Sequence, residues 1–192
     1  MINEKADNKI DNLQIDKKEI IVLAENRHGL HDDVILTFLD KYLNFLDGVL
    51  LELPIDFQDS INTYVNSGKI DDKLERYFNG AEREGKNIRG LLKIIDKVKK
   101  ANKTLACIDS SKVQTSQYYT PSKHGYYFLK GESRNEDMFE NINWYLNEKP
   151  GKYLIIAGAK HVEKGKHFRS GDDTLGARLE NKYRGRYVAI FL

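Results

Sequence analysis

Short apolar runs alternate along this chain with longer stretches in which apolar residues recur at helical spacing. The runs are apolar at successive positions, a pattern typical of strands that are buried on both faces. Alternation of such strands with amphipathic helices predicts an α/β fold, a three-layer sandwich with a mainly parallel central sheet. The strands are expected at residues 19–24, 49–53, 104–108, 153–157 and 187–192.

Helices are predicted between these strands. Residues 31–46 place apolar side chains at helical spacing behind Asp32 and Asp33, which favour the positive N-terminal end of a helix. Residues 87–100 carry apolar residues on one side and lysines on the other. Shorter helices are expected over 59–66, ended by Gly68, and over 71–79, ended by Gly80.

The second half of the chain contains a long polar segment and two more predicted helices. Residues 110–132 are rich in tyrosine, and only 126–129 resemble a strand. A long loop inside a compact domain is more often functional than idle. Ser133 and Glu136 form a capping box for a helix that runs to about Asn147. A basic loop, which carries Lys160, Lys164, Lys166 and Arg169, then leads to a helix expected to be capped by Asp172 or Asp173.

Composition narrows the class of protein. A chain of 192 residues fits one domain, expected over 18–192 behind a charged, loosely ordered lead-in over 1–17. The formal charge of +2 does not indicate a nucleic-acid partner. The N-terminus has no apolar signal core, and no apolar stretch of the sequence is long enough to span a bilayer. We therefore expect a cytoplasmic protein, or one delivered without a standard signal peptide. Oligomeric state is left open. Cys107, the single cysteine, lies in an apolar run and is expected to be a buried, reduced thiol.

Acidic and imidazole groups follow three of the predicted strands. Glu25-Asn26-Arg27-His28 ends the first apolar run, Glu52 ends the second, and His161 follows the fourth within a few residues. The carboxyl ends of parallel strands meet at one edge of a sheet, where α/β proteins place their ligand sites. The pattern therefore predicts an enzyme site at this edge.

Four sequence motifs in order carry a family resemblance. Ala24-Glu25-Asn26-Arg27-His28 resembles the G-E-x-x-H element of the erythromycin esterase/ChaN-like (EreA/ChaN-like, TIKI-related) superfamily. The helix from Arg134 through Met138 and Asn141 to Trp144 is similar to the R-N-x-x-M-x-x-N-x-x-W helix of its esterase branch. Gly158-Ala159-Lys160-His161-Val162 and Leu175-Gly176-Ala177-Arg178-Leu179 resemble its later histidine element and following helix.

The resemblance implies catalytic positions and several activities. It places the catalytic residues at Glu25, His28, Glu52, Arg134 and His161. The superfamily contains macrolide esterases, peptidases of bacterial toxins, metal-dependent proteases, haem-binding lipoproteins and effectors, so the fold does not determine the function. Macrolide esterases are longer and roof a deep cleft with extra helices, and the haem-binding branch carries a lipoprotein signal. Neither feature is found in this sequence.

A mechanism follows from the residue types. A neutral imidazole can remove a proton from water as the water attacks a carbonyl, and either His28 or His161 suits this role. We prefer His28 because Glu25 lies one turn away. The two glutamates would orient the imidazole, or one would act as an acid, and Arg134 would stabilise an oxyanion or balance the carboxylates. Because no serine or cysteine nucleophile is evident, the sequence predicts direct attack by water on an ester or amide of a small molecule, peptide or protein.

Alternatives stay open at this point. Two histidines and two carboxylates can bind zinc or manganese, although no tight ligand spacing is present, and we assign no metal ligand. A haem-binding protein and a bacterial effector or interaction domain are the alternative functions. Pairing of Glu52 with Arg134 can be purely structural. Asp109, at the end of the third strand, and Tyr126 are candidate substrate-binding residues, although Asp109 also suits a turn.

Overall fold

Five parallel strands form the centre of the protein. The computed structural model describes residues 14–26, 29, 31–83, 89–110, 119–122, 125–128, 134–166 and 171–192. The sheet has the order β3-β2-β6-β1-β7. All four neighbouring pairs are parallel. This arrangement confirms the predicted α/β fold class. The strands are β1 (Ile20–Glu25), β2 (Gly48–Pro54), β3 (Thr104–Asp109), β6 (Tyr153–Gly158) and β7 (Tyr187–Phe191).

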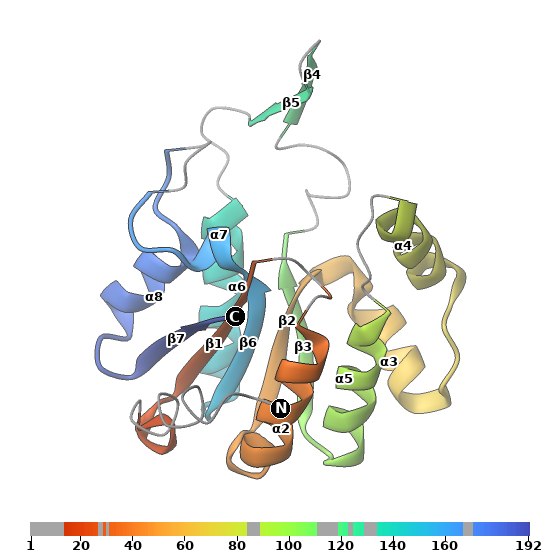
Figure 1. Ribbon diagram of the computed structural model, residues 1–192, viewed down its shortest axis with the longest axis horizontal. Helices are drawn as coiled ribbons and strands as arrows, with labels where there is room; N and C mark the ends of the chain where they lie inside the picture. The colour runs from red at the N-terminus through yellow and green to blue at the C-terminus, as the bar shows by residue number, and fades with distance from the viewer. Residues whose placement is uncertain are drawn as a thin grey trace.

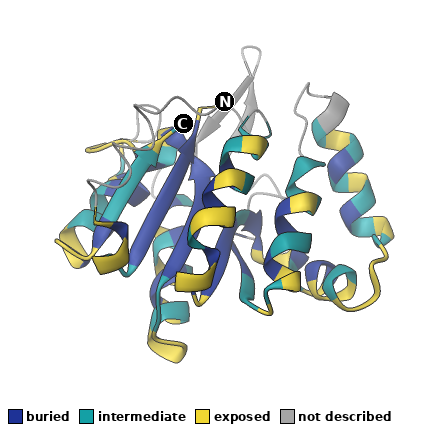
Figure 2. Ribbon diagram, turned by 60° about the horizontal axis from the view of Figure 1, so that its bottom comes forward, coloured by how far each residue is buried: buried dark blue, intermediate teal, exposed yellow. Residues whose placement is uncertain are grey.

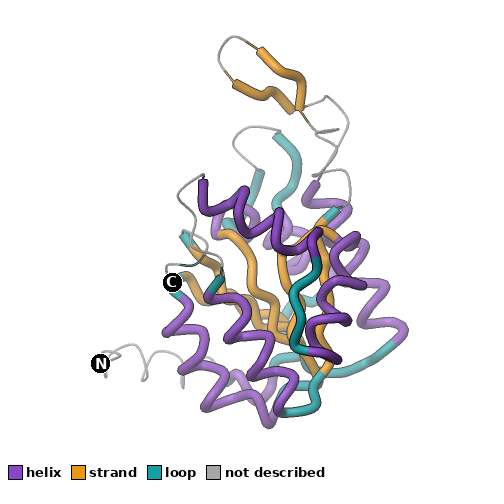
Figure 3. The backbone as a smooth tube through the Cα atoms, turned by 90° about the vertical axis from the view of Figure 1, so that its right-hand side faces the viewer, coloured by secondary structure: helices purple, strands orange, loops and turns teal. Residues whose placement is uncertain are grey.

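Helices cover both faces of the sheet, so the protein has three layers (Figures 1 and 3). Successive strand residues point to opposite faces. Ile21 and Leu23 accordingly join one buried apolar cluster, and Ile20 and Val22 join the other. The first cluster packs under α2 (Asp32–Tyr42), α3 (Gln58–Ser67), α4 (Asp72–Arg83) and α5 (Gly90–Lys100). The second packs under α6 (Arg134–Glu148), α7 (Ala159–Val162) and α8 (Leu175–Lys182).

The predicted strands agree with the structure to within one residue at each end, and most helices agree closely. Gly68 ends α3 as expected, with a positive φ of 72°. Gly80 does not end α4, which continues to Arg83. An interior glycine costs a helix only about 1 kcal/mol, which the buried apolar face of α4 offsets. The predicted capping box of α6 involves Ser133, which lies outside the described residues.

Three short features differ from the sequence-based expectations. The cap of α8 is Thr174, not an aspartate, and its hydroxyl accepts from the Ala177 N–H at 3.2 Å. The predicted basic loop begins with the short helix α7. The tyrosine-rich segment contains an antiparallel hairpin of β4 (Tyr119–Ser122) and β5 (Gly125–Phe128), of which only the second strand was predicted. Local patterns are weakest for such short elements because few residues carry the signal.

Three 3₁₀ turns complete the described structure: η1 (Ile15–Lys17), η2 (Leu43–Phe45) and η3 (Ile55–Phe57). Ile15 is buried and joins the apolar cluster under α2. The end of the predicted lead-in therefore packs on the domain. Residues 1–13, and the loose order predicted for them, lie outside the described residues.

Candidate active site

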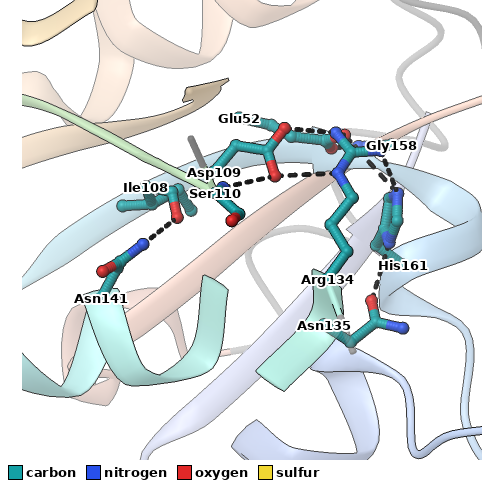
Figure 4. A network of polar contacts seen from close by, with 9 residues as sticks. All are labelled: Glu52, Ile108, Asp109, Ser110, Arg134, Asn135, Asn141, Gly158 and His161. Atoms are coloured by element: carbon teal, nitrogen blue, oxygen red, sulfur yellow. Dashed lines mark hydrogen bonds and ion pairs between the residues drawn. The ribbon is translucent and has the colours of Figure 1, made fainter. Parts of the chain in front are cut away.

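Arg134 is the centre of a polar network at the carboxyl edge of the sheet (Figure 4). It is the first residue of α6. Its Nε donates to Asp109 Oδ1 at 2.8 Å, and its Nη2 donates both to Asp109 Oδ2 and to Glu52 Oε1, the latter at 2.8 Å. Farther along α6, the Asn141 amide donates to the Ile108 carbonyl at 2.9 Å, which ties the helix to β3. One guanidinium thus joins two carboxylates from neighbouring strands.

Glu52 lies where β2 loses its regular pairing. The register between β2 and β3 shifts between Leu51 and Pro54. Irregularities of this kind redirect side chains near the ends of strands. The carboxylate is 4% exposed, and its Oε2 accepts from the Gly158 N–H at 2.5 Å. Glu52 is therefore held between Arg134 and the end of β6.

Both ring nitrogens of His161 have hydrogen-bond partners. Its Nε2 lies 3.2 Å from Arg134 Nη1 and 3.6 Å from Glu52 Oε1. Its Nδ1 lies 2.7 Å from Oδ1 of Asn135, a buried residue. Because a guanidinium only donates, Nε2 acts as the acceptor, and the proton of the neutral ring resides on Nδ1, which donates to Asn135. This tautomer is assigned from the hydrogen-bond network.

Burial and nearby charges shift the pKa values of two ionisable groups in this region. Burial raises the pKa of the Asp109 carboxyl above its ordinary value, while Arg134 acts in the opposite direction. Burial also raises the pKa of Tyr77, on α4, to about 12, and the nearby charges of Glu52 and Asp109 contribute to this shift. Tyr77 is therefore a neutral hydroxyl at physiological pH, within electrostatic reach of the network.

Glu25 lies at the same edge of the sheet. It is the last residue of β1, it is buried, and it is in register with Gly158 of β6. The Gly29 N–H donates to Glu25 Oε1 at 3.3 Å. Burial, followed by the charge of Glu25, raises the pKa of Asp32 at the start of α2. A second pair of acids thus occupies the edge beside the Arg134 network.

The structure brings together Glu52, Asp109, Arg134 and His161 and places Glu25 at the same edge. His28 and the side chain of Tyr126 lie outside the described residues. Sequence reasoning missed the Gly158 N–H, Asn135 and Tyr77 as parts of this environment. Asn135 could have been recognised from the sequence, since it follows Arg134 in the motif that carries the family resemblance. No local pattern in the sequence distinguishes Tyr77 from a core residue.

The described residues offer neither a metal cluster nor an accessible thiol. Among them, no group of three or more histidine, cysteine, aspartate or glutamate side chains has an arrangement that could hold a metal ion. Cys107 is buried and unpaired, as predicted, and burial raises the pKa of its thiol to about 12. Such a thiol is a poor nucleophile because the thiolate is the reactive form. No helix in the described ranges is long and apolar enough to cross a membrane.

Gly176 allows α7, the helix that carries His161, to pack closely against α8. A Cβ atom at position 176 would lie 2.0 Å from the carbonyl oxygen of Val162, the last residue of α7. Because this neighbour is backbone, the contact cannot be relieved by a side-chain rotation. The small residue in the Leu175-Gly176-Ala177 motif thus positions α7.

We therefore expect Gly176→Ala to lower the free energy of unfolding by about 1–3 kcal/mol, the usual cost of overpacking. The displacement of α7 should also weaken the contacts of His161. Gly80→Ala is the matched control, because a Cβ at this helical position meets nothing within 4 Å. It should stabilise the protein by up to about 1 kcal/mol. Urea denaturation of both variants measures the difference, and equal stabilities would contradict the packing argument.

Comparison with known proteins relates the fold to several solved structures. No protein-family model and no curated protein matches the chain. The C-terminal region of Pasteurella multocida toxin, whose structure is described as revealing a thiol-protease like catalytic triad, superposes with a TM-score of 0.66 at 15% identity over 98% of this chain. A mutant of the erythromycin esterase EreC in its open conformation gives 0.64 at 12% identity over 96%. A Bacillus cereus protein gives 0.64 at 15% identity over 95%.

These matches support the fold relation that the sequence motifs predicted. The protein has an α/β fold shared with an esterase and with part of a bacterial toxin, and identities of 12–15% show this fold alone. The chain spans only 25% of the Pasteurella toxin chain, 67% of the Bacillus cereus chain and 72% of the esterase chain. The activities of those proteins therefore bear only on a proposal for this one.

Proposed function

We propose that this protein is a small hydrolase that cleaves an ester or amide bond with a water molecule activated at the carboxyl edge of the sheet. The observation that carries the proposal is the convergence of Glu52, Arg134 and His161 from three distant segments. Such a cluster of mutually bonded ionisable groups with little exposure to solvent is typical of functional sites. Its position at the carboxyl ends of parallel strands also favours a functional site.

His28 is our candidate for the general base. Both ring nitrogens of His161 already have partners, Arg134 on one side and Asn135 on the other. A base needs a free lone pair directed at the water, so these contacts favour a positioning role for His161. His28 follows Glu25 by three residues, and Glu25 would orient its ring and stabilise the imidazolium that forms.

We assign to Arg134 the balancing of charge between Glu52 and Asp109, which is one of the two roles considered from the sequence. Its contacts with both carboxylates support this assignment. Asp109 would hold the guanidinium in place. Direct substrate binding by Asp109 and Tyr126 stays a prediction. Because burial disfavours the Cys107 thiolate, attack by water is preferred over a thiol mechanism.

An effector module of a larger protein is the second candidate. Three of the similar solved structures are bacterial toxins, and this chain spans 25–36% of their length. A module of this kind could still be a hydrolase with a protein substrate. The two candidates therefore differ in the substrate that they predict.

A screen of small esters and short peptides tests the proposal. We expect turnover that survives both iodoacetamide and a chelator, because neither a thiol nor a metal is assigned a role. Glu25→Gln is a nearly isosteric variant that removes the charge, and it should lower turnover. Activity abolished by iodoacetamide would refute attack by water. Turnover unchanged in Glu25→Gln would refute the assigned site.

A further inference from the structure

The edge of the sheet opposite the candidate site carries a concentration of positive charge. We define the basic edge as the last helical turn and the connection before each of the five strands. The segments are 15–19, 42–47, 97–103, 145–152 and 179–186. Together they contain eleven lysines and arginines and five acidic residues, a formal charge of +6. Because the whole chain carries +2, the remainder carries −4, and the basic edge is more positive than the chain as a whole.

The five segments form one continuous surface. Asp47 joins three of them, since its N–H donates to the Lys152 carbonyl at 2.7 Å and its carbonyl accepts from the Thr104 N–H at 3.0 Å. Glu19 links the other two, because its N–H donates to the Arg186 carbonyl at 2.9 Å and its carbonyl accepts from the Tyr153 N–H at 2.8 Å. Figure 2, in which this edge is turned forward, shows exposed residues along it. The charges therefore share one face.

Helix dipoles account for only part of this charge. In a parallel α/β fold the helices present their C-termini at this edge, and each C-terminus carries about half a negative charge that favours nearby lysines. The helical segments ending before β2, β3, β6 and β7 together offset roughly two positive charges, which leaves about four. Lys99 and Lys100, in the last turn of α5, are both exposed.

An exposed aromatic residue lies within the basic edge. Phe45, at the end of η2, is 64% exposed, the highest value among the large hydrophobic residues of the described ranges. Beside it, Lys103 Nζ lies 3.5 Å from the Asn44 carbonyl. An exposed apolar ring on a face that carries lysines fits a bilayer surface, where the ring enters the interface and the lysines contact anionic head groups.

We propose that the basic edge docks on a membrane surface that contains anionic lipid. The helix C-termini at this edge provide no backbone N–H groups to enclose an individual phosphate, so binding would depend on the lysine and arginine side chains. Diffuse lysine charge needs no such geometry, because it responds to the summed potential of the surface. The candidate active site, at the other end of the strands, would face the aqueous phase. The proposal does not depend on the proposed hydrolase activity.

Vesicle sedimentation with the full chain tests the proposal. We expect binding to vesicles that contain phosphatidylserine and little binding to phosphatidylcholine alone, with strong weakening as salt shortens the screening length from about 10 Å to about 3 Å. The double variant Lys99→Glu, Lys100→Glu should reduce the vesicle partition coefficient by at least about tenfold. The matched control, Lys164→Glu with Lys166→Glu, makes the same charge change in exposed residues that follow α7 and should bind more tightly than the first variant. Melting curves identify any variant that does not fold.

Phe45→Ser separates a membrane from other polyanions. It should weaken binding to anionic vesicles by about tenfold, since the ring no longer enters the interface, while heparin binding stays unchanged. Vesicle binding that Phe45→Ser leaves intact, together with parallel loss of vesicle and heparin binding in the lysine variant, would indicate a general polyanion or nucleic-acid surface and overturn the proposal. Equal binding to neutral and anionic vesicles would overturn it as well.

Discussion

Replacing Arg134 with alanine should lower the free energy of unfolding by about 3–5 kcal/mol, the usual cost of breaking a buried ion pair. The carboxylates of Glu52 and Asp109 are 4% and 1% exposed, and Arg134 donates to both. Without the guanidinium, two acids are left in a poorly hydrated region where ionisation is unfavourable. Urea denaturation at neutral pH measures the loss. Arg134→Lys keeps the charge but not the bidentate geometry, so its free energy of unfolding should lie between those of the wild-type protein and Arg134→Ala.

The size of this loss should depend on pH. A carboxyl whose pKa is raised by folding contributes stability that is present below its ordinary value and is lost as the pH rises through the folded value. Burial raises the pKa of Asp109 and Arg134 opposes this shift, so the variant should have a still higher pKa at Asp109. Arg134→Ala should therefore be closer to the wild-type protein at about pH 5 than at about pH 8.

A triple variant provides the control for this interpretation. Adding Glu52→Gln and Asp109→Asn to Arg134→Ala removes both charges that the arginine balances. We expect this change to recover much of the lost stability and to abolish its pH dependence, because neutral amides need no cation. If the triple variant is as unstable as Arg134→Ala at every pH, the loss arises from packing and the electrostatic explanation is wrong.

His28→Ala should reduce turnover by about 10²–10⁴-fold, the usual contribution of a general base, with little change in melting temperature. His161→Ala should act differently, because it removes a partner from both Arg134 Nη1 and Asn135 Oδ1. Leaving buried polar groups without partners costs about 1–3 kcal/mol, so this variant should lose stability as well as activity. Turnover and melting, measured together on a substrate found in the screen, distinguish the two roles.

The matched control for the histidine variants is His31→Ala. His31 precedes α2, and its side chain makes no capping hydrogen bond. We expect only small changes in turnover and melting. If His161→Ala abolishes turnover without loss of stability while His28→Ala retains turnover, the general base would be His161, and the present assignment would be reversed.

The prediction of the fold from the sequence succeeded where a local pattern reflects how the residues are buried. Strands such as Tyr153–Gly158 are apolar at every position because both of their faces are covered, and this feature can be recognised without knowing the partners. The gathering of Glu52, Asp109 and His161 at one edge follows in the same way, because parallel strands end together. The prediction was less accurate for short elements. The helix α7 and the Thr174 cap depend on how α7 and α8 pack, and a few residues cannot encode that locally.

The sequence by itself therefore determined the order of strands and helices, the buried apolar faces and the ionisable groups at the carboxyl edge. Only the tertiary structure decided which group binds which, because the contacts join residues far apart in the chain: Arg134 to Glu52 across 82 positions, and Gly158 to Glu52 across 106. It likewise decided the tautomer of His161 and the gathering of lysines from five segments on the opposite edge. Hydrogen bonds and electrostatic fields depend on distance in space, and folding alone sets that distance.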